Sequence, residues 1–102
     1  MLAEFSVSPA GAESMGDEVA RCLDLVDRSG LDYQLTAMGT LVEGEWDAVL
    51  DLIGRCHEAV REEAGRVVTT IRIDDREGVE GALRSKVADV ERILGRELRK
   101  SP

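Results

Sequence analysis

Residues 33–44 read Tyr-Gln-Leu-Thr-Ala-Met-Gly-Thr-Leu-Val-Glu-Gly, and this stretch predicts a β-hairpin. Gly39 can adopt the positive φ that a tight turn needs, so we expect the turn to centre on Met38 and Gly39. That turn sets three cross-strand pairs, Leu35 with Val42 on one face and Thr36 with Leu41 and Gln34 with Glu43 on the other. The hairpin is therefore expected to have one core face and one polar face.

Two further stretches, residues 4–8 and 67–74, alternate in the same way. Their apolar positions are Phe5, Val7, Ile71 and Ile73. Their opposite positions carry hydroxyl or charged groups, namely Ser6, Ser8, Thr70, Arg72 and Asp74. A sheet face with these groups is either solvated or binds something.

Three segments show the three-to-four spacing of a helix that is apolar on one side. The first carries Met15, Val19, Cys22, Leu23 and Val26, follows a capping signal at Ser14 and Asp17, and stops at Gly30. The second spans about 45–63, with Trp46, Val49, Leu50, Ile53, His57 and Val60 on its inward stripe. The third follows residue 78, with Leu83, Val87, Val90 and Leu94 expected to face inward.

The resulting order, β-α-β-β-α-β with an added C-terminal helix, predicts an α+β ferredoxin-like sandwich with a four-stranded antiparallel sheet. We expect one domain over residues 1–102. The first and third strands of this fold are central, which would bring Ser6 and Ser8 near Glu43. Arg72 and Asp74 would lie on the neighbouring edge strand, and Gln34 and Thr36 on the opposite edge. The uncovered sheet face then suits association with a second copy of the chain, with a pocket at the interface between the two sheets.

The composition narrows the range of functions. Thirteen basic against 21 acidic residues give a net charge of −8, which disfavours a nucleic-acid partner and suits a neutral or cationic small molecule. Residues 1–10 lack a basic cluster followed by an apolar run, and the sequence has no apolar segment of membrane-spanning length. We therefore expect a soluble, cytoplasmic protein with no membrane partner.

Few residues are candidates for chemistry. His57, the single histidine, lies on an apolar stripe, so a packed and hydrogen-bonded role is favoured over acid–base work. Cys22 and Cys56 are interpreted as reduced, packed thiols, and no metal-ligand spacing is present. Glu43 and Arg72 are charged positions near the middle of a sheet, which indicates either an ion pair beneath an interface or contact with a ligand.

Four stretches of the sequence resemble the small thiamine-binding protein family. They are Ser6-Val-Ser-Pro9, Tyr33 to Thr40 with Glu43-Gly44, Arg66 to Asp74, and Lys86 to Glu91, and together they track the whole domain. The resemblance implies a homo-oligomer in which dimers pair into tetramers through their sheets. It also implies binding of thiamine or its hydroxymethylpyrimidine portion, without catalysis and without a cofactor.

A ligand of this kind is compatible with the polar face. An aminopyrimidine offers both donors and acceptors, and the thiazolium of thiamine is cationic. We expect the binding residues to be Ser6, Ser8, Thr36, Glu43, Arg72 and Asp74, with Glu43 as the anchor. Two alternatives stay open: a structural or regulatory oligomerisation module, and a small dimeric α+β enzyme that uses Glu43, Asp74 or His57.

Overall fold

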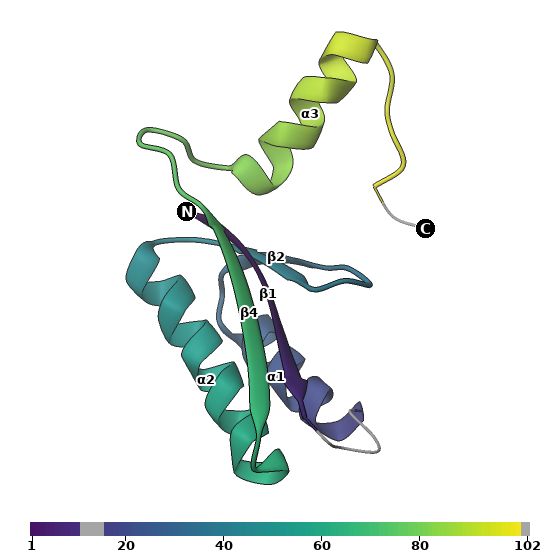
Figure 1. The fold of residues 1–102 in the computed structure, drawn as a ribbon. Coiled ribbons are helices and arrows are strands. Elements are labelled where there is room, and N and C mark those ends of the chain that lie inside the picture. The colour runs from purple at the N-terminus through teal and green to yellow at the C-terminus, as the bar shows by residue number, and fades with distance from the viewer. Residues whose placement is uncertain (11–15, 101–102) are drawn as a thin grey trace.

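The computed structural model describes residues 1–10 and 16–100 of the chain, and its elements follow the predicted order (Figure 1). The strands are β1 (Leu2–Pro9), β2 (Asp32–Leu35), β3 (Thr40–Glu43) and β4 (Val67–Asp74). The helices are α1 (Gly16–Arg28), α2 (Trp46–Ala64) and α3 (Ala82–Leu94). The ferredoxin-like α+β fold with a C-terminal helix is thereby confirmed. Ser14 and Met15, which were expected to open the first helix, lie outside the described residues.

The four strands form one antiparallel sheet in the order β2-β3-β1-β4, with β1 and β3 in the centre as predicted. The two central strands share only a short register, from Leu2 opposite Glu43 to Phe5 opposite Thr40. The longer pairing with β4 runs from Leu2 opposite Asp74 to Pro9 opposite Val67. Half of β1 therefore extends beyond the end of β3.

The predicted hairpin register is wrong by two residues. Leu35 lies opposite Thr40 rather than Val42, and Gln34 lies opposite Leu41. Gly39 is not among the glycines with positive φ. Its small size matters instead, because a Cβ at this position would come within 3.0 Å of the Phe5 carbonyl oxygen. The turn packs against β1, and this long-range contact requires the glycine.

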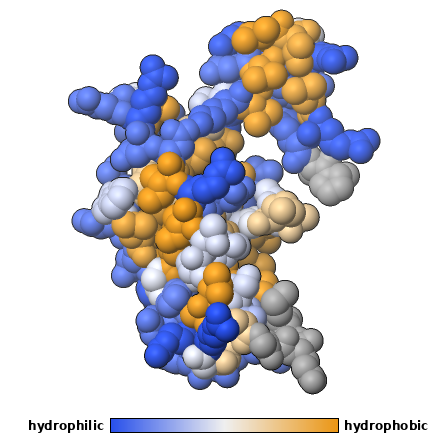
Figure 2. All heavy atoms as spheres, viewed as in Figure 1, coloured by the Kyte–Doolittle hydropathy of each residue, from blue (hydrophilic) through white to orange (hydrophobic). Residues whose placement is uncertain are grey.

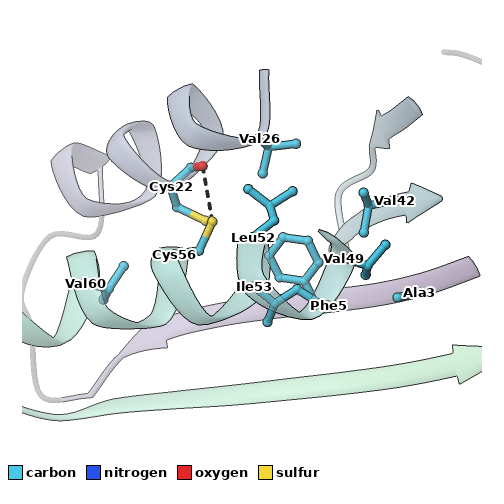
Figure 3. Close-up of a cluster of buried hydrophobic side chains, with 10 residues drawn as sticks. All are labelled: Ala3, Phe5, Cys22, Val26, Val42, Val49, Leu52, Ile53, Cys56 and Val60. Atoms are coloured by element: carbon cyan, nitrogen blue, oxygen red, sulfur yellow. Dashed lines mark hydrogen bonds between the residues drawn. The ribbon is translucent and has the colours of Figure 1, made fainter. Parts of the chain in front are cut away.

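Helices α1 and α2 cover one face of the sheet and enclose the core (Figure 3). Phe5 and Val42 point into this core from the two central strands, while Val49, Ile53 and Val60 reach it from α2. Trp46 does not join them: it stands at the first position of α2 with half of its surface exposed, contrary to the prediction. Leu52 and Cys56 take up the remaining inward positions of the helix.

Helix α3 stands beyond the end of the sheet, away from α1 and α2 (Figure 1). Of the four residues expected to face inward, Leu83 is half-buried, whereas Val87, Val90 and Leu94 are exposed. Ala82 is the buried residue of the helix. The prediction of an inward stripe is therefore wrong for this chain taken alone. Figure 2 shows the resulting hydrophobic patch on α3. Across the described residues, no helix combines the length and the apolar character needed to cross a membrane.

Candidate functional site

The six residues predicted to bind a ligand separate into two groups at opposite ends of the sheet. Glu43 and Asp74 share one cross-strand row, because Leu2 of β1 lies between them, and Arg72 lies two rows along, opposite Glu4. Ser6 and Ser8 lie further along β1, where β3 has already ended. The expected proximity of these serines to Glu43 is therefore wrong, for the reason that β3 is only four residues long.

The Glu43 side chain binds the N-terminus of α3. Its Oε2 accepts a hydrogen bond from the Ala82 amide at 2.7 Å, and its Oε1 lies 3.4 Å from the Leu83 amide nitrogen. The residue before the helix is Gly81, which has no side chain to cap these amides. A carboxylate from a distant strand thus supplies the cap. In the sequence, the missing Ser, Thr or Asp before residue 82 is the signal that the helix needs such a partner.

The other charged side chains at this end of the sheet form ion pairs. Asp74 pairs with Lys86 of α3, and Arg72 lies 3.8 Å from the Glu4 carboxylate. The neighbouring Lys86 ammonium lowers the pKa of Asp74 below its usual range. A hollow of about 320 Å³ lies between this end of the sheet and α3, with Glu43, Asp74 and Lys86 on its wall.

The other group surrounds a second hollow, of about 350 Å³, which opens where β1 continues past the end of β3. We call it the hairpin hollow, and define it by residues from three elements. They are Phe5, Ser6, Val7 and Ser8 of β1, Val19, Cys22 and Leu23 of α1, and the hairpin residues Leu35 to Thr40. Ser6, Ser8 and Thr36 are therefore brought together, as part of an otherwise mostly apolar wall.

The backbone of Val7 faces this hollow. Met1 and Gly44 exchange two backbone hydrogen bonds, at 3.0 and 3.1 Å, so the N–H and C=O of odd-numbered β1 residues point toward β3. The Ala10 amide bonds to the Arg66 carbonyl at 2.9 Å, which places even-numbered residues on the β4 side. Val7 is the first odd-numbered residue beyond the last β1–β3 pair. Within residues 1–10 and 16–100, no strand pairs with its peptide groups on that side.

Thr36 organises the hairpin turn. Its Oγ1 donates to the Gly39 carbonyl at 2.9 Å and accepts from the amides of Met38 and Gly39 at 3.2 and 3.1 Å. The backbone amide of Thr36 donates to the same Gly39 carbonyl. This turn holds the Met38 side chain outward, with 86% of its surface exposed, at the mouth of the hairpin hollow. Thr36 therefore positions the wall of the hollow.

His57 has the packed, hydrogen-bonded position that was predicted. Its Nδ1 lies 2.7 Å from Thr69 Oγ1, joining α2 to β4 on the helix side of the sheet. Cys22 and Cys56 are both free and buried, so both thiols are packed as predicted. Among the described residues, no group of three or more side chains of the kinds that bind metals comes together.

Comparison with known proteins gives one consistent result. A family model described as thiamine-binding protein matches residues 3–91. A UPF0045 protein of Mycobacterium bovis is 43% identical over 96 residues, covering 92% of this chain and 94% of the relative.

Solved structures resemble the fold closely. A hypothetical protein of Methanocaldococcus jannaschii superposes with a TM-score of 0.80 at 29% identity, over 87% of this chain and 93% of its own. A Thermotoga maritima protein, whose description assigns it provisionally to thiamine biosynthesis or salvage, has a TM-score of 0.74 over 87% and 96% of the two chains. At 22% identity this second likeness shows the fold alone.

Proposed function

The chain belongs to the thiamine-binding protein family, and from that membership we propose that it binds thiamine or its hydroxymethylpyrimidine portion in the hairpin hollow. The proposed role is binding without catalysis. Hydroxyl, thiol, thioether and apolar groups line the hollow, and its described lining contains neither a carboxylate nor an imidazole. This supports a binding protein over the small enzyme that the sequence left open.

The observation that carries the proposal is that the backbone N–H and C=O of Val7 face the hairpin hollow beyond the end of β3. A backbone N–H and C=O that face a hollow form an adjacent donor and acceptor. An aminopyrimidine presents the complementary pair, because its ring nitrogen accepts and its exocyclic amino group donates. We propose that the pyrimidine completes the hydrogen bonding of β1 in the place where β3 ends.

The rest of the hollow suits this ligand in shape and polarity. Its volume of about 350 Å³ lies at the small end of the range for small-molecule pockets, which are mostly apolar with a few placed polar groups. Phe5, Leu23 and Met38 supply apolar surface for the ring, and Ser6 and Ser8 add hydroxyls at the rim. The protein's net charge of −8 favours a ligand whose second ring is a cation.

A second location is the hollow between the sheet and α3. Glu43 and Asp74 place two carboxylates there, which would suit the thiazolium cation, and Arg72 lies two rows away. Binding at this location would have to compete with the hydrogen bonds that Glu43 already makes to α3. We therefore place the pyrimidine at Val7, and treat Glu43 as the anchor of the alternative site.

Calorimetric titration with thiamine and with hydroxymethylpyrimidine tests the location. The Val7→Pro substitution removes the N–H that faces the hollow and leaves the hydrogen bonds to β4 intact, so we expect binding to weaken about 5- to 10-fold, the effect of one lost hydrogen bond. Ser6→Ala should weaken binding less. The matched control is Thr70→Ala, because Thr70 is the cross-strand partner of Ser6 and lies outside the hollow.

A ligand analogue tests the same idea without changing the protein. The pyrimidine that lacks the exocyclic amino group should bind about 5- to 10-fold more weakly to the unmodified chain. Unchanged affinity for this analogue, together with full binding by Val7→Pro, would contradict the location at β1. Absence of any thiamine binding or thermal stabilisation would favour the oligomerisation module instead.

We also propose that the protein assembles as a homo-oligomer, a tetramer, that covers the open face of the sheet and brings the hollow to an interface. The exposed apolar side chains of α3 support this, because a hydrophobic patch of this kind is commonly an association surface. The free thiols support a cytoplasmic location. Light scattering that reports only monomer at micromolar concentration would contradict the assembly.

A further inference from the structure

We propose that Cys22 and Cys56 form a peroxide-sensitive thiol pair, which closes to a disulfide between α1 and α2 when the protein meets hydrogen peroxide. The two are the only cysteines of the chain and are 34 residues apart in sequence. The packing of α1 on α2 brings them together. The geometry behind this modification does not involve the proposed ligand, although Cys22 lies on the wall of the hairpin hollow.

The geometry brings the Cys56 side chain against the backbone of Cys22. Cys56 Sγ lies 3.5 Å from the backbone carbonyl oxygen of Cys22, so the two helices approach closely at this point. Figure 3 shows both side chains pointing toward one another from α1 and α2. Closing the bond therefore needs a small rearrangement of two side chains rather than a new helix arrangement.

The two thiols differ in access and in acidity. Cys22 is 6% exposed and forms part of the wall of the hairpin hollow, whereas Cys56 is fully enclosed. A hydrogen bond from the Cys56 thiol lowers the pKa of Cys22, while the pKa of Cys56 is raised by Cys22 and by burial. Because the thiolate is the nucleophile, Cys22 is the thiol that reacts first.

The chemistry needs one molecule of hydrogen peroxide, which is small enough to enter through the hollow. The Cys22 thiolate attacks one peroxide oxygen, the O–O bond breaks, and Cys22 becomes a sulfenic acid as hydroxide leaves and takes up a proton. The Cys56 sulfur then attacks the Cys22 sulfur, and the sulfenic oxygen leaves with the Cys56 proton as water. Overall, two thiols are oxidised to one disulfide and the peroxide is reduced to two molecules of water.

The test is peroxide treatment of the native protein followed by intact mass and free-thiol measurement. We expect a mass loss of two hydrogen atoms, loss of both thiols, and a higher Tm that a reductant reverses, since the new bond closes a loop between two helices. Oxidation of Met38, which is 86% exposed, shows in the same spectra that the peroxide was active.

Two single variants assign the roles. In Cys56→Ser, Cys22 should accumulate as a sulfenic acid that dimedone traps. In Cys22→Ser, Cys56 should stay reduced under the same conditions. The proposal is overturned if both thiols survive while Met38 is oxidised, if Cys56 reacts without Cys22, or if the disulfides formed join separate chains on a non-reducing gel.

Discussion

The sandwich formed by the sheet with α1 and α2, and the separate helix α3, bury their apolar residues to very different extents. Ile53 in α2 is 2% exposed and Ile93 in α3 is 81% exposed, although both are isoleucines of amphipathic helices. The radius of gyration, 15.1 Å, exceeds the value of about 13 Å typical of a compact domain of this length, because α3 extends from the body. Periodicity therefore marks an apolar face in both regions, but among residues 1–10 and 16–100 only the face of α2 is covered by other parts of the chain.

The two regions also differ in what holds them. The sandwich is held by apolar burial, with Val26, Val42 and Val49 completely enclosed. Helix α3 is held at its first turns, by the Glu43 carboxylate on its amides and by the ion pairs of Lys86 with Asp74 and Arg84 with Asp32. Such exposed polar contacts are worth far less than core burial. The free energy of local opening should therefore be much lower for α3 than for the sandwich.

The largest expected effect comes from the same substitution made in both regions. Ile53→Ala should lower the free energy of unfolding by about 2 to 5 kcal/mol, because it leaves a cavity in a filled core. Ile93→Ala should change it by less than about 0.5 kcal/mol in the monomer. Urea unfolding measures both.

Repeating the unfolding measurements at several protein concentrations shows whether Ile93 is buried between subunits. If Ile93→Ala destabilises the protein strongly at high concentration and weakly at low concentration, the side chain is buried between subunits. An equally large loss from both variants in a dilute monomer would contradict the division into two regions.

A smaller effect is expected at the link between them. Glu43→Gln keeps the shape but removes the charge from the α3 cap, which should cost about 1 kcal/mol of local stability, measured as faster hydrogen exchange of the first α3 amides. Amides of α2 should be unaffected. The control is Glu45→Gln, because the Glu45 side chain makes no capping hydrogen bond.

The same Glu43 variant separates the two candidate sites. Unchanged thiamine affinity is expected, since the pyrimidine is placed at Val7. Weaker thiamine binding with unchanged exchange of the α3 amides would show that Glu43 anchors the ligand.

The smallest expected effect is the pH dependence of the Asp74–Lys86 ion pair. Lys86 lowers the pKa of Asp74 in the folded protein, so the stability that this pair contributes is present above the ordinary carboxyl pKa and is lost as the pH falls through the lowered value. Asp74→Asn should therefore be slightly less stable than the unmodified protein at pH 7. The two should converge below about pH 3. Urea midpoints at both pH values measure this, and a difference that persists in acid would mean that another interaction was lost.

The sequence by itself determined the elements and their faces. Alternation placed Phe5 toward the helices and Ser6 toward the open face, and helical spacing marked Val49, Ile53 and Val60 as core. These features depend on the period of a strand or a helix, which neighbouring residues set locally. The strand order followed from the same order of elements.

Only the tertiary structure decided which residues meet across the chain. The length of β3 separated Ser8 from Glu43, the contact of Gly39 with Phe5 set the hairpin register, and helix packing joined Cys22 to Cys56. No local period encodes such distances, because each arises when segments far apart in sequence pack together. Glu43 shows the difference most clearly. The alternation of the hairpin sequence predicted its place on the open face, but its hydrogen bond from the Ala82 amide depends on how α3 packs against the end of the sheet.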